Sequence, residues 1–261
     1  MASRGKSSMP RVDEVGRRVA VVTGGAGGNG QAIALGFRAA GYRVVLVDVD
    51  AARLASVRHS AFGDSADCTT VVCDVSDAGD CERAARSIAD AHGRIDVLVN
   101  GAGLYRLNRI GDADFRAAYE RLMRVNTDGV LNMTLALRAQ LERTGGAIVN
   151  IASIESFLAG SSSVGYTVSK TAVVGLTRAL AAELAPRGIR VNAVAPGIVD
   201  TPMVAHLVDD ERAGQRARNR IPMKRFAAPE EIAGIVVFLA SPAASYMTGS
   251  VVVADGGYLL G

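Results

Sequence analysis

The sequence predicts an α/β fold built on one doubly wound, seven-stranded parallel sheet with helices on both faces. Short runs rich in β-branched residues alternate with longer, alanine-rich stretches of helical character. The runs are apolar throughout, as strands are when both faces of a parallel sheet are covered. With 261 residues, of which 49% are hydrophobic, the chain has the length expected of a single domain of this kind.

The expected elements alternate along the chain as repeated strand–helix–strand units. Seven apolar runs are the expected strands: RRVAVVT (17–23), YRVVLVD (42–48), TTVVCDV (69–75), IDVLVN (95–100), GAIVNIA (146–152), IRVNAVA (189–195) and SVVVAD (250–255). Helices are expected at about 29–40, 51–60, 78–92, 112–142, 164–186 and 229–240.

The domain organisation follows from the same alternation. We expect a flexible tail over 1–16 and a single domain over 17–261. The segment 202–226 interrupts the alternation after the sixth run, and it combines two prolines with a strongly charged middle. Because loops at the carboxyl ends of the strands form the ligand crevice in such sheets, we expect 202–226 to be a substrate lid.

Charge and cysteine content exclude several classes of protein. The net charge of +3 arises in the first 18 residues, which hold five basic and two acidic side chains, so no nucleic-acid partner is expected. No apolar run approaches the roughly 18 residues of a membrane span, and the first ten residues resemble no signal peptide. Three cysteines at spacings unlike a zinc site predict reduced thiols, no metal and a cytoplasmic location.

A glycine-rich turn joins the first expected strand to the first expected helix. Its key positions are Thr23, Gly24, Gly28, Asn29 and Gly30. Glycine lets the backbone approach a pyrophosphate, and the first N–H groups of a helix point toward the anion. We therefore expect a dinucleotide cofactor here, although a glycine cluster alone also fits a flexible turn.

Asp48 ends the second expected strand, eighteen positions after Gly30. Its carboxylate would accept hydrogen bonds from the adenosine ribose hydroxyls and would repel a 2′-phosphate. The residue therefore favours NAD over NADP, although Arg53 lies one helical turn away and could approach a phosphate. The alternative interpretation of Asp48 is an N-cap for the helix that follows.

Three further side chains suggest carbonyl chemistry. Tyr166 and Lys170 stand at positions i and i+4 of an expected helix, so they share one face. A nearby ammonium would lower the pKa of a tyrosine from about 10 toward the range of a general base. Ser153 ends the fifth expected strand, where its hydroxyl would reach a substrate oxygen. Glu155 and His206 are expected in loops, either solvated or in contact with a polar substrate.

Five ordered motifs resemble the short-chain dehydrogenase/reductase family: TGGAGGNG (23–30), NGAG (100–103), Ser153, YTVSK (166–170) and PGIVDTPM (196–203). The resemblance covers about 17–257 and implies a Rossmann fold. It implies that Tyr166 is the general acid/base and that Ser153 polarises the carbonyl. It also implies that Lys170 binds the nicotinamide ribose and that Asn126 supports a proton relay. Further cofactor contacts are implied for Asp74, Val75, Asn100, Ala102, Gly103, Tyr166, Pro196, Gly197, Val199 and Thr201.

We thus predict an NAD-dependent oxidoreductase that moves hydride between the nicotinamide and a small secondary alcohol or ketone. The resemblance also implies a homotetramer. Asn29 and Gly101 depart from the family pattern, but neither departure removes a catalytic group. One alternative is a 3-oxoacyl-[acyl-carrier-protein] reductase, with Arg143 and Arg187 as candidate docking residues for an acidic carrier. The other alternative is a non-catalytic NAD-sensing protein.

Overall fold

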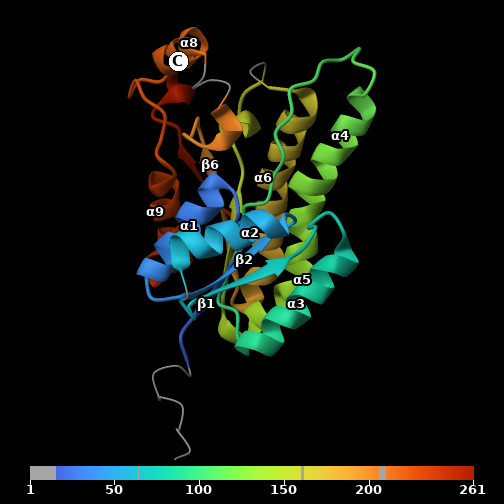
Figure 1. Cartoon of the computed structure of the whole chain (residues 1–261), viewed down its shortest axis with the longest axis vertical. Coiled ribbons are helices and arrows are strands. Elements are labelled where there is room, and N and C mark those ends of the chain that lie inside the picture. The colour runs from blue at the N-terminus through green and yellow to red at the C-terminus, as the bar shows by residue number, and fades with distance from the viewer. Residues whose placement is uncertain (1–15, 64, 160–161, 206–209) are drawn as a thin grey trace, which may run out of the picture.

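A seven-stranded parallel sheet forms the centre of the molecule. The computed structural model describes residues 16–63, 65–159, 162–205 and 210–261. The strand order is β3-β2-β1-β4-β5-β6-β7, which confirms the predicted doubly wound sheet (Figure 1). The strands are β1 (Val19–Thr23), β2 (Arg43–Asp48), β3 (Cys68–Val72), β4 (Val97–Asn100), β5 (Ala147–Ile151), β6 (Arg190–Pro196) and β7 (Val251–Ala254).

The helices also follow the prediction closely, except that α8 was not expected. They are α1 (Gly28–Ala39), α2 (Ala51–Val57), α3 (Ala78–His92), α4 (Phe115–Met123), α5 (Gly129–Thr144), α6 (Val164–Leu184), α8 (Glu211–Arg220) and α9 (Pro229–Ala240). The single helix expected over 112–142 corresponds to an uninterrupted helical segment in which a π-helical turn at Arg124–Asp128 lies between α4 and α5. The segment 202–226 contains α8, which the sequence pattern did not predict.

Both faces of the central strands are buried, which explains why these strands are mainly apolar. In β1, Ala20 and Val22 belong to a core with side chains of α1 and α9. Val19 and Val21 point the other way, into a core with side chains of α3, α5 and α6. Figure 1 shows these two groups of helices on opposite sides of the sheet. Alternate residues of one strand thus serve two cores, and neither set meets water.

The strand order reverses beside β1, which lies between β2 and β4. Thr23 and Asn100 are paired at the carboxyl ends of β1 and β4. In doubly wound sheets the connections diverge at such a point and leave a crevice outside the strand ends. The glycine turn after β1 and the turn after β4 therefore face the same space.

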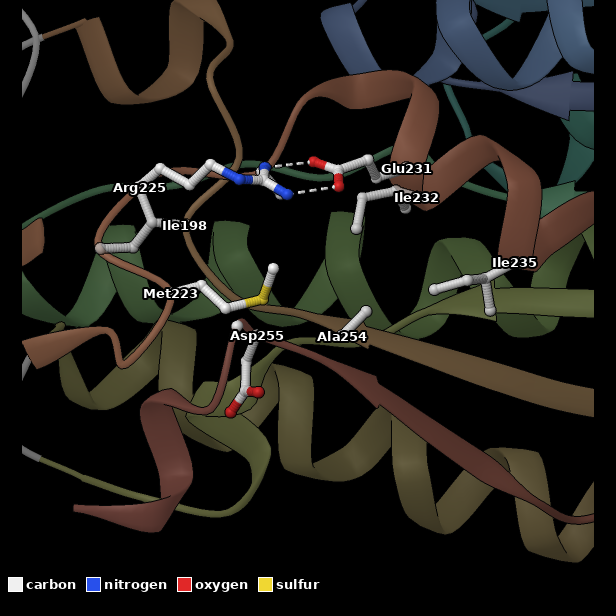
Figure 2. Close-up of a pocket in the computed structure, with 10 residues that line it drawn as sticks. Ile198, Met223, Arg225, Glu231, Ile232, Ile235, Ala254 and Asp255 are labelled. Atoms are coloured by element: carbon white, nitrogen blue, oxygen red, sulfur yellow. Dashed lines mark hydrogen bonds and ion pairs between the residues drawn. The ribbon is translucent and has the colours of Figure 1, made fainter.

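The carboxyl end of the segment 202–226 is attached to the body of the protein. Ile221 is buried in a cluster with Tyr258. Arg225 donates to both carboxylate oxygens of Glu231 on α9, at 2.6 and 2.7 Å. Figure 2 shows this ion pair beside a cavity of about 300 Å³, which is also lined by the end of β7. These contacts hold one end of the segment in place.

The described residues contain neither a membrane-spanning helix nor a cluster of metal ligands. None of the helices in these ranges is long and apolar enough to cross a membrane. Within the same ranges, no group of three or more His, Cys, Asp or Glu side chains could hold a metal ion. The expected tail over 1–16 falls outside the described residues except for Gly16.

Candidate active site

The glycines of the turn after β1 are required by close contacts between backbones. Gly24 has φ +69°, and a Cβ there would lie 2.7 Å from the carbonyl oxygen of Gly101. A Cβ on Gly28 would lie 2.8 Å from Cγ2 of Thr201, and one on Gly30 would overlap the carbonyl of Gly24. Side chains at these positions would separate the three strand-end loops, so the glycines let these loops meet around one space.

Thr23 joins two of these loops. Its hydroxyl accepts hydrogen bonds from the N–H groups of Gly101 and Ala102, at 3.0 and 3.1 Å, and donates to the carbonyl of Val99 at 3.3 Å. The side chain is 1% exposed. Thr23 therefore holds the turn after β4 against the turn after β1, and its hydroxyl is engaged within the protein.

A cavity of about 830 Å³ lies at this edge of the sheet. It brings together ten of the residues expected at the cofactor: Gly24, Gly28, Asn29, Gly30, Asp48, Asp74, Val75, Ala102, Gly103 and Thr201. The lining residues that were not expected include Cys73, Leu104, Tyr105, Arg121 and Arg124. Tyr105 lies two residues after the NGAG motif, in the loop that follows β4. No sequence pattern distinguishes Arg121 and Arg124 from other arginines on helix surfaces.

Asp48 is fixed beside the glycine turn. Its Oδ2 accepts the N–H of Ala26 at 3.1 Å, and its Oδ1 accepts the N–H of Asp50 at 3.2 Å. Arg53 donates to the carbonyl of Ala26 at 3.1 Å, so both side chains bind the same residue of the turn. The N-cap of α2 is Asp50, whose side chain accepts the N–H of Arg53. Asp48 is therefore free of the capping role that the sequence left open.

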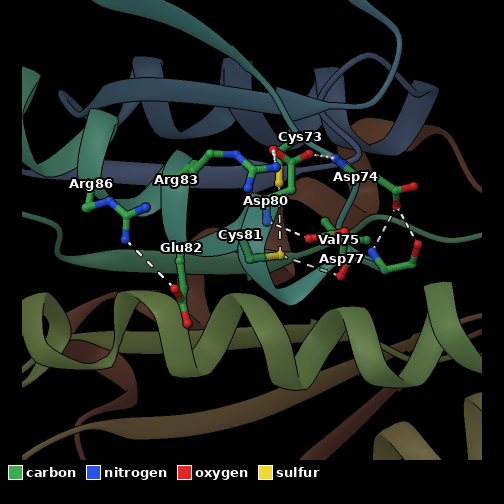
Figure 3. Close-up of polar contacts among 10 residues, drawn as sticks. Cys73, Asp74, Val75, Asp77, Asp80, Cys81, Glu82, Arg83 and Arg86 are labelled. Carbon is green, nitrogen blue, oxygen red and sulfur yellow. Dashed lines mark hydrogen bonds and ion pairs between the residues drawn. The ribbon is translucent and has the colours of Figure 1, made fainter.

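The turn after β3 forms another wall of the cavity (Figure 3). Asp74 is exposed, and its Oδ1 accepts hydrogen bonds from the N–H and the hydroxyl of Ser76, at 2.9 and 2.7 Å. Its own N–H donates to Oδ2 of Asp80 at 2.7 Å. Val75 packs on α5, where a Cβ on Gly129 would lie 2.7 Å from it. The turn is thus held from both α3 and α5.

Seven expected cofactor residues lie outside the lining of the cavity: Thr23, Asn100, Tyr166, Lys170, Pro196, Gly197 and Val199. Asn100 is buried and donates to Oδ1 of Asn150 at 2.9 Å. Pro196 ends β6, and the N–H of Gly197 donates to the carbonyl of Ala254. Val199 forms an isolated bridge with Ala227 and is 5% exposed. These residues support the strand ends that carry the cavity.

Asn126 lies in the π-turn between α4 and α5, and it is fully buried. Its Oδ1 accepts the N–H of Leu104 at 2.7 Å. Its Nδ2 donates to the carbonyl of Leu104 at 2.9 Å and to the hydroxyl of Ser169 at 3.0 Å. The amide therefore binds the loop after β4 to α6. A π-turn of this kind often occurs at functional sites because it redirects one side chain of a helix.

Lys170 lies in α6, is 5% exposed, and donates from Nζ to the carbonyl of Ile151 at 2.8 Å. Burial lowers the pKa of its ammonium to about 8. A Cβ on Gly103 would lie 3.5 Å from this Nζ and 3.4 Å from Oδ1 of Asn126. The small residue at 103 therefore leaves both polar groups close to the wall of the cavity.

Tyr166 lies one turn before Lys170, and its ring centroid is 6.0 Å from Nζ. Tyr105 packs edge-on against it, with 5.0 Å between ring centroids. Burial raises the pKa of Tyr166 to about 12. A side-chain hydrogen bond with Ser153 lowers this pKa, whereas electrostatic interactions with Glu155 and Tyr105 raise it. The net pKa of Tyr166 is therefore raised rather than lowered in the chain alone, because desolvation outweighs the hydrogen bond with Ser153.

Glu155 belongs to the same site. It is 7% exposed, and its Oε2 accepts the hydroxyls of Ser162 and Thr167 at 2.9 and 3.1 Å. Its N–H donates to the hydroxyl of Ser153 at 3.2 Å. Glu155 is therefore not a solvated loop residue but a buried carboxylate beside Ser153 and Tyr166. His206 lies outside the described residues.

Fold and site together define an α/β oxidoreductase with a nucleotide crevice. A family model described as enoyl-(acyl carrier protein) reductase matches residues 24–259. A 3-oxoacyl-[acyl-carrier-protein] reductase of Thermotoga maritima is 38% identical over 247 residues, which cover 93% of this chain and 98% of that protein. D-threitol dehydrogenase of Mycolicibacterium smegmatis is 39% identical over 244 residues, 93% of each chain.

A solved structure with a similar fold is also similar in sequence. The Pseudomonas aeruginosa RhlG/NADP active-site complex matches with a TM-score of 0.87 and 34% identity, covering 96% of this chain and 99% of that one. The chain belongs to the short-chain dehydrogenase/reductase family.

Proposed function

We propose that this enzyme transfers hydride between NAD and a small secondary alcohol or ketone. The observation that carries the proposal is the meeting of Ser153, Tyr166 and Lys170 next to the cavity that begins at the glycine turn. Ser153 comes from the end of β5, and the other two come from α6. A hydrogen-bonded Ser–Tyr pair with a buried ammonium nearby is suited to moving a proton on and off a substrate oxygen.

The residues present fit a dinucleotide. The glycine turn offers backbone N–H groups at the amino end of α1, where an anion is favourable. We propose that the cofactor is held by Thr23, Gly24, Gly28, Asn29, Gly30, Asp48, Asp74, Val75, Asn100, Ala102, Gly103, Tyr166, Lys170, Pro196, Gly197, Val199 and Thr201. Several of these act by shaping the strand ends, as the contacts of Thr23 and Asn100 show.

Each catalytic side chain has a distinct proposed role. The bound nicotinamide would supply the hydride acceptor or donor. Ser153 would donate its hydroxyl hydrogen bond to the substrate oxygen, and Tyr166 would exchange the proton at its Oη. Lys170 would place a positive charge near the phenol and favour its ionised form. Asn126 would keep the loop at Leu104 in position, through the three hydrogen bonds already described.

The choice of NAD rests on Asp48. Its carboxylate lies in the cavity beside the glycine turn, where a 2′-phosphate would meet its negative charge. The similar RhlG structure is a complex with NADP, and Arg53 is close enough to Ala26 to offer a counter-charge here. We nevertheless propose NAD, because Asp48 is held in place by two backbone N–H groups.

The identity to a 3-oxoacyl-[acyl-carrier-protein] reductase favours a second candidate, reduction of a carrier-bound ketone. The basic residues that would dock an acidic carrier are already engaged. Arg187 pairs with Glu142 at 2.8 Å, and Arg138 shares the same carboxylate oxygen at 2.7 Å. Arg143 donates to Gln140 at 2.6 Å. Both arginines remain exposed and Arg143 keeps its full charge, so the substrate panel decides between a free and a carrier-linked ketone. The filled catalytic positions disfavour a non-catalytic sensor.

A substrate panel tests the proposed function directly. Purified enzyme is given NAD with alcohols, polyols, sugars and hydroxysteroids, or NADH with the matching ketones and a carrier-linked ketone, while NADH absorbance is followed. Turnover of free secondary alcohols or ketones supports the proposal. Turnover of the carrier-linked ketone alone would favour the second candidate, and cofactor binding without any turnover would favour the sensor.

We also propose a homotetramer in the cytoplasm. Apolar side chains are exposed on two outer elements, Val253 of β7 at 41% and Phe238 of α9 at 43%. The carboxyl-terminal Leu260 is 86% exposed. Burial of such a surface against further copies of the chain would stabilise an oligomer. The three cysteines are free and buried, which suits a reducing compartment.

Removing the charge of Glu155 is expected to move alcohol oxidation to lower pH. The carboxylate raises the pKa of Tyr166, so Glu155→Gln should let the phenol ionise at a lower pH. The amide oxygen can still accept from Ser162 and Thr167, which preserves the loop. The measurement is kcat/KM for oxidation across pH in both proteins. Glu183→Gln, at an exposed position of α6, is the matched control, and a midpoint that stays in place or rises would contradict the prediction.

The segment 202–226 is proposed as a lid, and it is expected to become more protected when ligands bind. Thr201, Pro202 and Met203 line the cavity, whereas Ile221 and Arg225 fix the other end. Closure would therefore involve α8 and the residues before it. Hydrogen exchange in α8 should slow with NADH plus a substrate analogue, while exchange in α9 stays constant. Equal exchange in α8 with and without these ligands would exclude a lid.

A further inference from the structure

Two cysteines meet at the wall of the cofactor cavity. The Sγ atoms of Cys73 and Cys81 are 4.0 Å apart, and the residues are 1% and 0% exposed. Cys73 follows β3, and Cys81 lies in the first turns of α3, as Figure 3 shows. The third cysteine, Cys68, begins β3 and contacts the carbonyl of Thr69 instead. The chain thus has one close pair and one separate thiol.

Access to the pair is through the cavity. Cys73 is one of its lining residues, next to Asp74, while Cys81 lies behind it. A small solute in the cavity is therefore next to Cys73, and it reaches the buried sulfur when the wall opens locally; the second sulfur is 4.0 Å from the first. The catalytic roles proposed above use neither thiol.

We propose that Cys73 and Cys81 are an oxidation site at which a hydroperoxide closes an intrachain disulfide. One thiol would be oxidised to a sulfenic acid while the O–O bond of the peroxide breaks and an alcohol, or water, leaves. The other thiol would attack that sulfur, and water would leave as the S–S bond forms. Overall, two thiols and one hydroperoxide give one disulfide, one alcohol and one water, so atoms and electrons balance.

The chemistry around the pair determines its reactivity. The S–H of Cys73 donates to Cys81, and this lowers the pKa of Cys81, although burial and the charges of Asp80 and Asp74 oppose it. The pKa of Cys73 is raised by the same hydrogen bond and by burial. The first proton is thus lost from Cys81 more easily than from Cys73. The nearby carboxylates slow the reaction, so the site responds to strong oxidant exposure rather than to trace peroxide.

Closing the disulfide would disturb the cofactor wall. An S–S bond is about 2.05 Å long, so the sulfurs must approach each other by about half of their present separation. Asp74 follows Cys73 directly and is bound through its N–H to Asp80, the residue before Cys81. Val75 accepts the S–H of Cys81 at 3.5 Å. The oxidised form should therefore bind the cofactor more weakly, and by linkage bound cofactor should slow oxidation.

The test uses hydrogen peroxide on the purified protein, with thiol titration after denaturation and intact mass. Wild type should lose two of its three thiols and two hydrogen atoms, and digestion should give a peptide pair joined at Cys73 and Cys81. Cys68→Ala, the matched control, should lose both remaining thiols. Cys81→Ala and Cys73→Ala should form no intrachain disulfide. Saturating NADH should slow the wild-type reaction at least about fivefold.

Other results would overturn the proposal. Retention of all three thiols, a disulfide that involves Cys68, or oxidation only to sulfinic acid would each show that the pair does not close. Equal rates with and without NADH, in a protein shown by fluorescence to bind NADH, would show that the pair is not coupled to the cofactor wall. Failure of NADH to bind at all would instead count against the proposed function, because the thiol measurements do not depend on it.

Discussion

Replacing Tyr166 with Phe should reduce turnover at least about a hundredfold and leave NADH binding intact, since a positioned acid/base contributes at least that factor. The substitution removes the Oη that would exchange the substrate proton. It keeps the ring that packs edge-on against Tyr105 at 5.0 Å. The measurements are kcat on the best substrate of the panel and NADH affinity by fluorescence titration.

Tyr105→Phe is the matched control for this experiment, because it removes the neighbouring phenol oxygen and retains the same ring contact. It should keep most of the turnover. The role of Tyr166 would be refuted by a Tyr166→Phe enzyme with more than about a tenth of wild-type turnover. Loss of NADH binding in that variant would mean that Tyr166 acts chiefly through the cofactor.

Wild-type enzyme should prefer NAD over NADP by roughly a hundredfold in kcat/KM, and Asp48→Ala should remove most of that preference. The carboxylate of Asp48 would accept from both ribose hydroxyls, each bond contributing about 1.5–3 kcal/mol. In NADP the 2′-phosphate replaces one ribose hydroxyl, so one of these bonds is lost. The phosphate and the carboxylate of Asp48 also repel each other, at an effective dielectric near 20. After solvent screening, a difference of about 3 kcal/mol in favour of NAD should remain. Asp48→Ala should change the ratio mainly by improving NADP.

Arg53→Gln gives the complementary variant, because Arg53 donates to the carbonyl of Ala26 beside Asp48. Loss of this cation should weaken NADP further and leave NAD nearly unchanged. Both cofactors are measured at saturating substrate in all three proteins. A wild-type preference for NADP, or a ratio that Asp48→Ala does not move, would show that Asp48 does not face the ribose.

The fold was predictable because its signals are local. Each strand is rich in apolar residues, and β1 leads directly into glycines whose contacts with Gly101 and Thr201 leave no space for a Cβ. The π-helical turn at Arg124–Asp128 was not predictable. It is stabilised by contacts of Asn126 with Leu104 and Ser169. These residues are distant in sequence, so local helical propensity does not predict the contacts.

The site was predictable to a similar extent. Motifs identified which residues gather at the strand ends, but they did not separate those that line the cavity from those that support it. Thr23 and Asn100 are examples, since their hydrogen bonds lead to other parts of the chain. The pKa of Tyr166 was also beyond the sequence, because it depends on how completely the fold removes water from the phenol.

The burial of Lys170 has a consequence for folding. Its pKa falls from 10.5 in an ordinary lysine to about 8 in the folded chain. Below about pH 8 both states carry the proton, and the buried charge then costs about 3 kcal/mol of stability, at 1.36 kcal/mol per pKa unit. As the pH rises from about 8 to 10.5, the folded state loses the proton first and this cost disappears. At neutral pH, the catalytic role proposed for Lys170 therefore opposes the thermal stability of the fold.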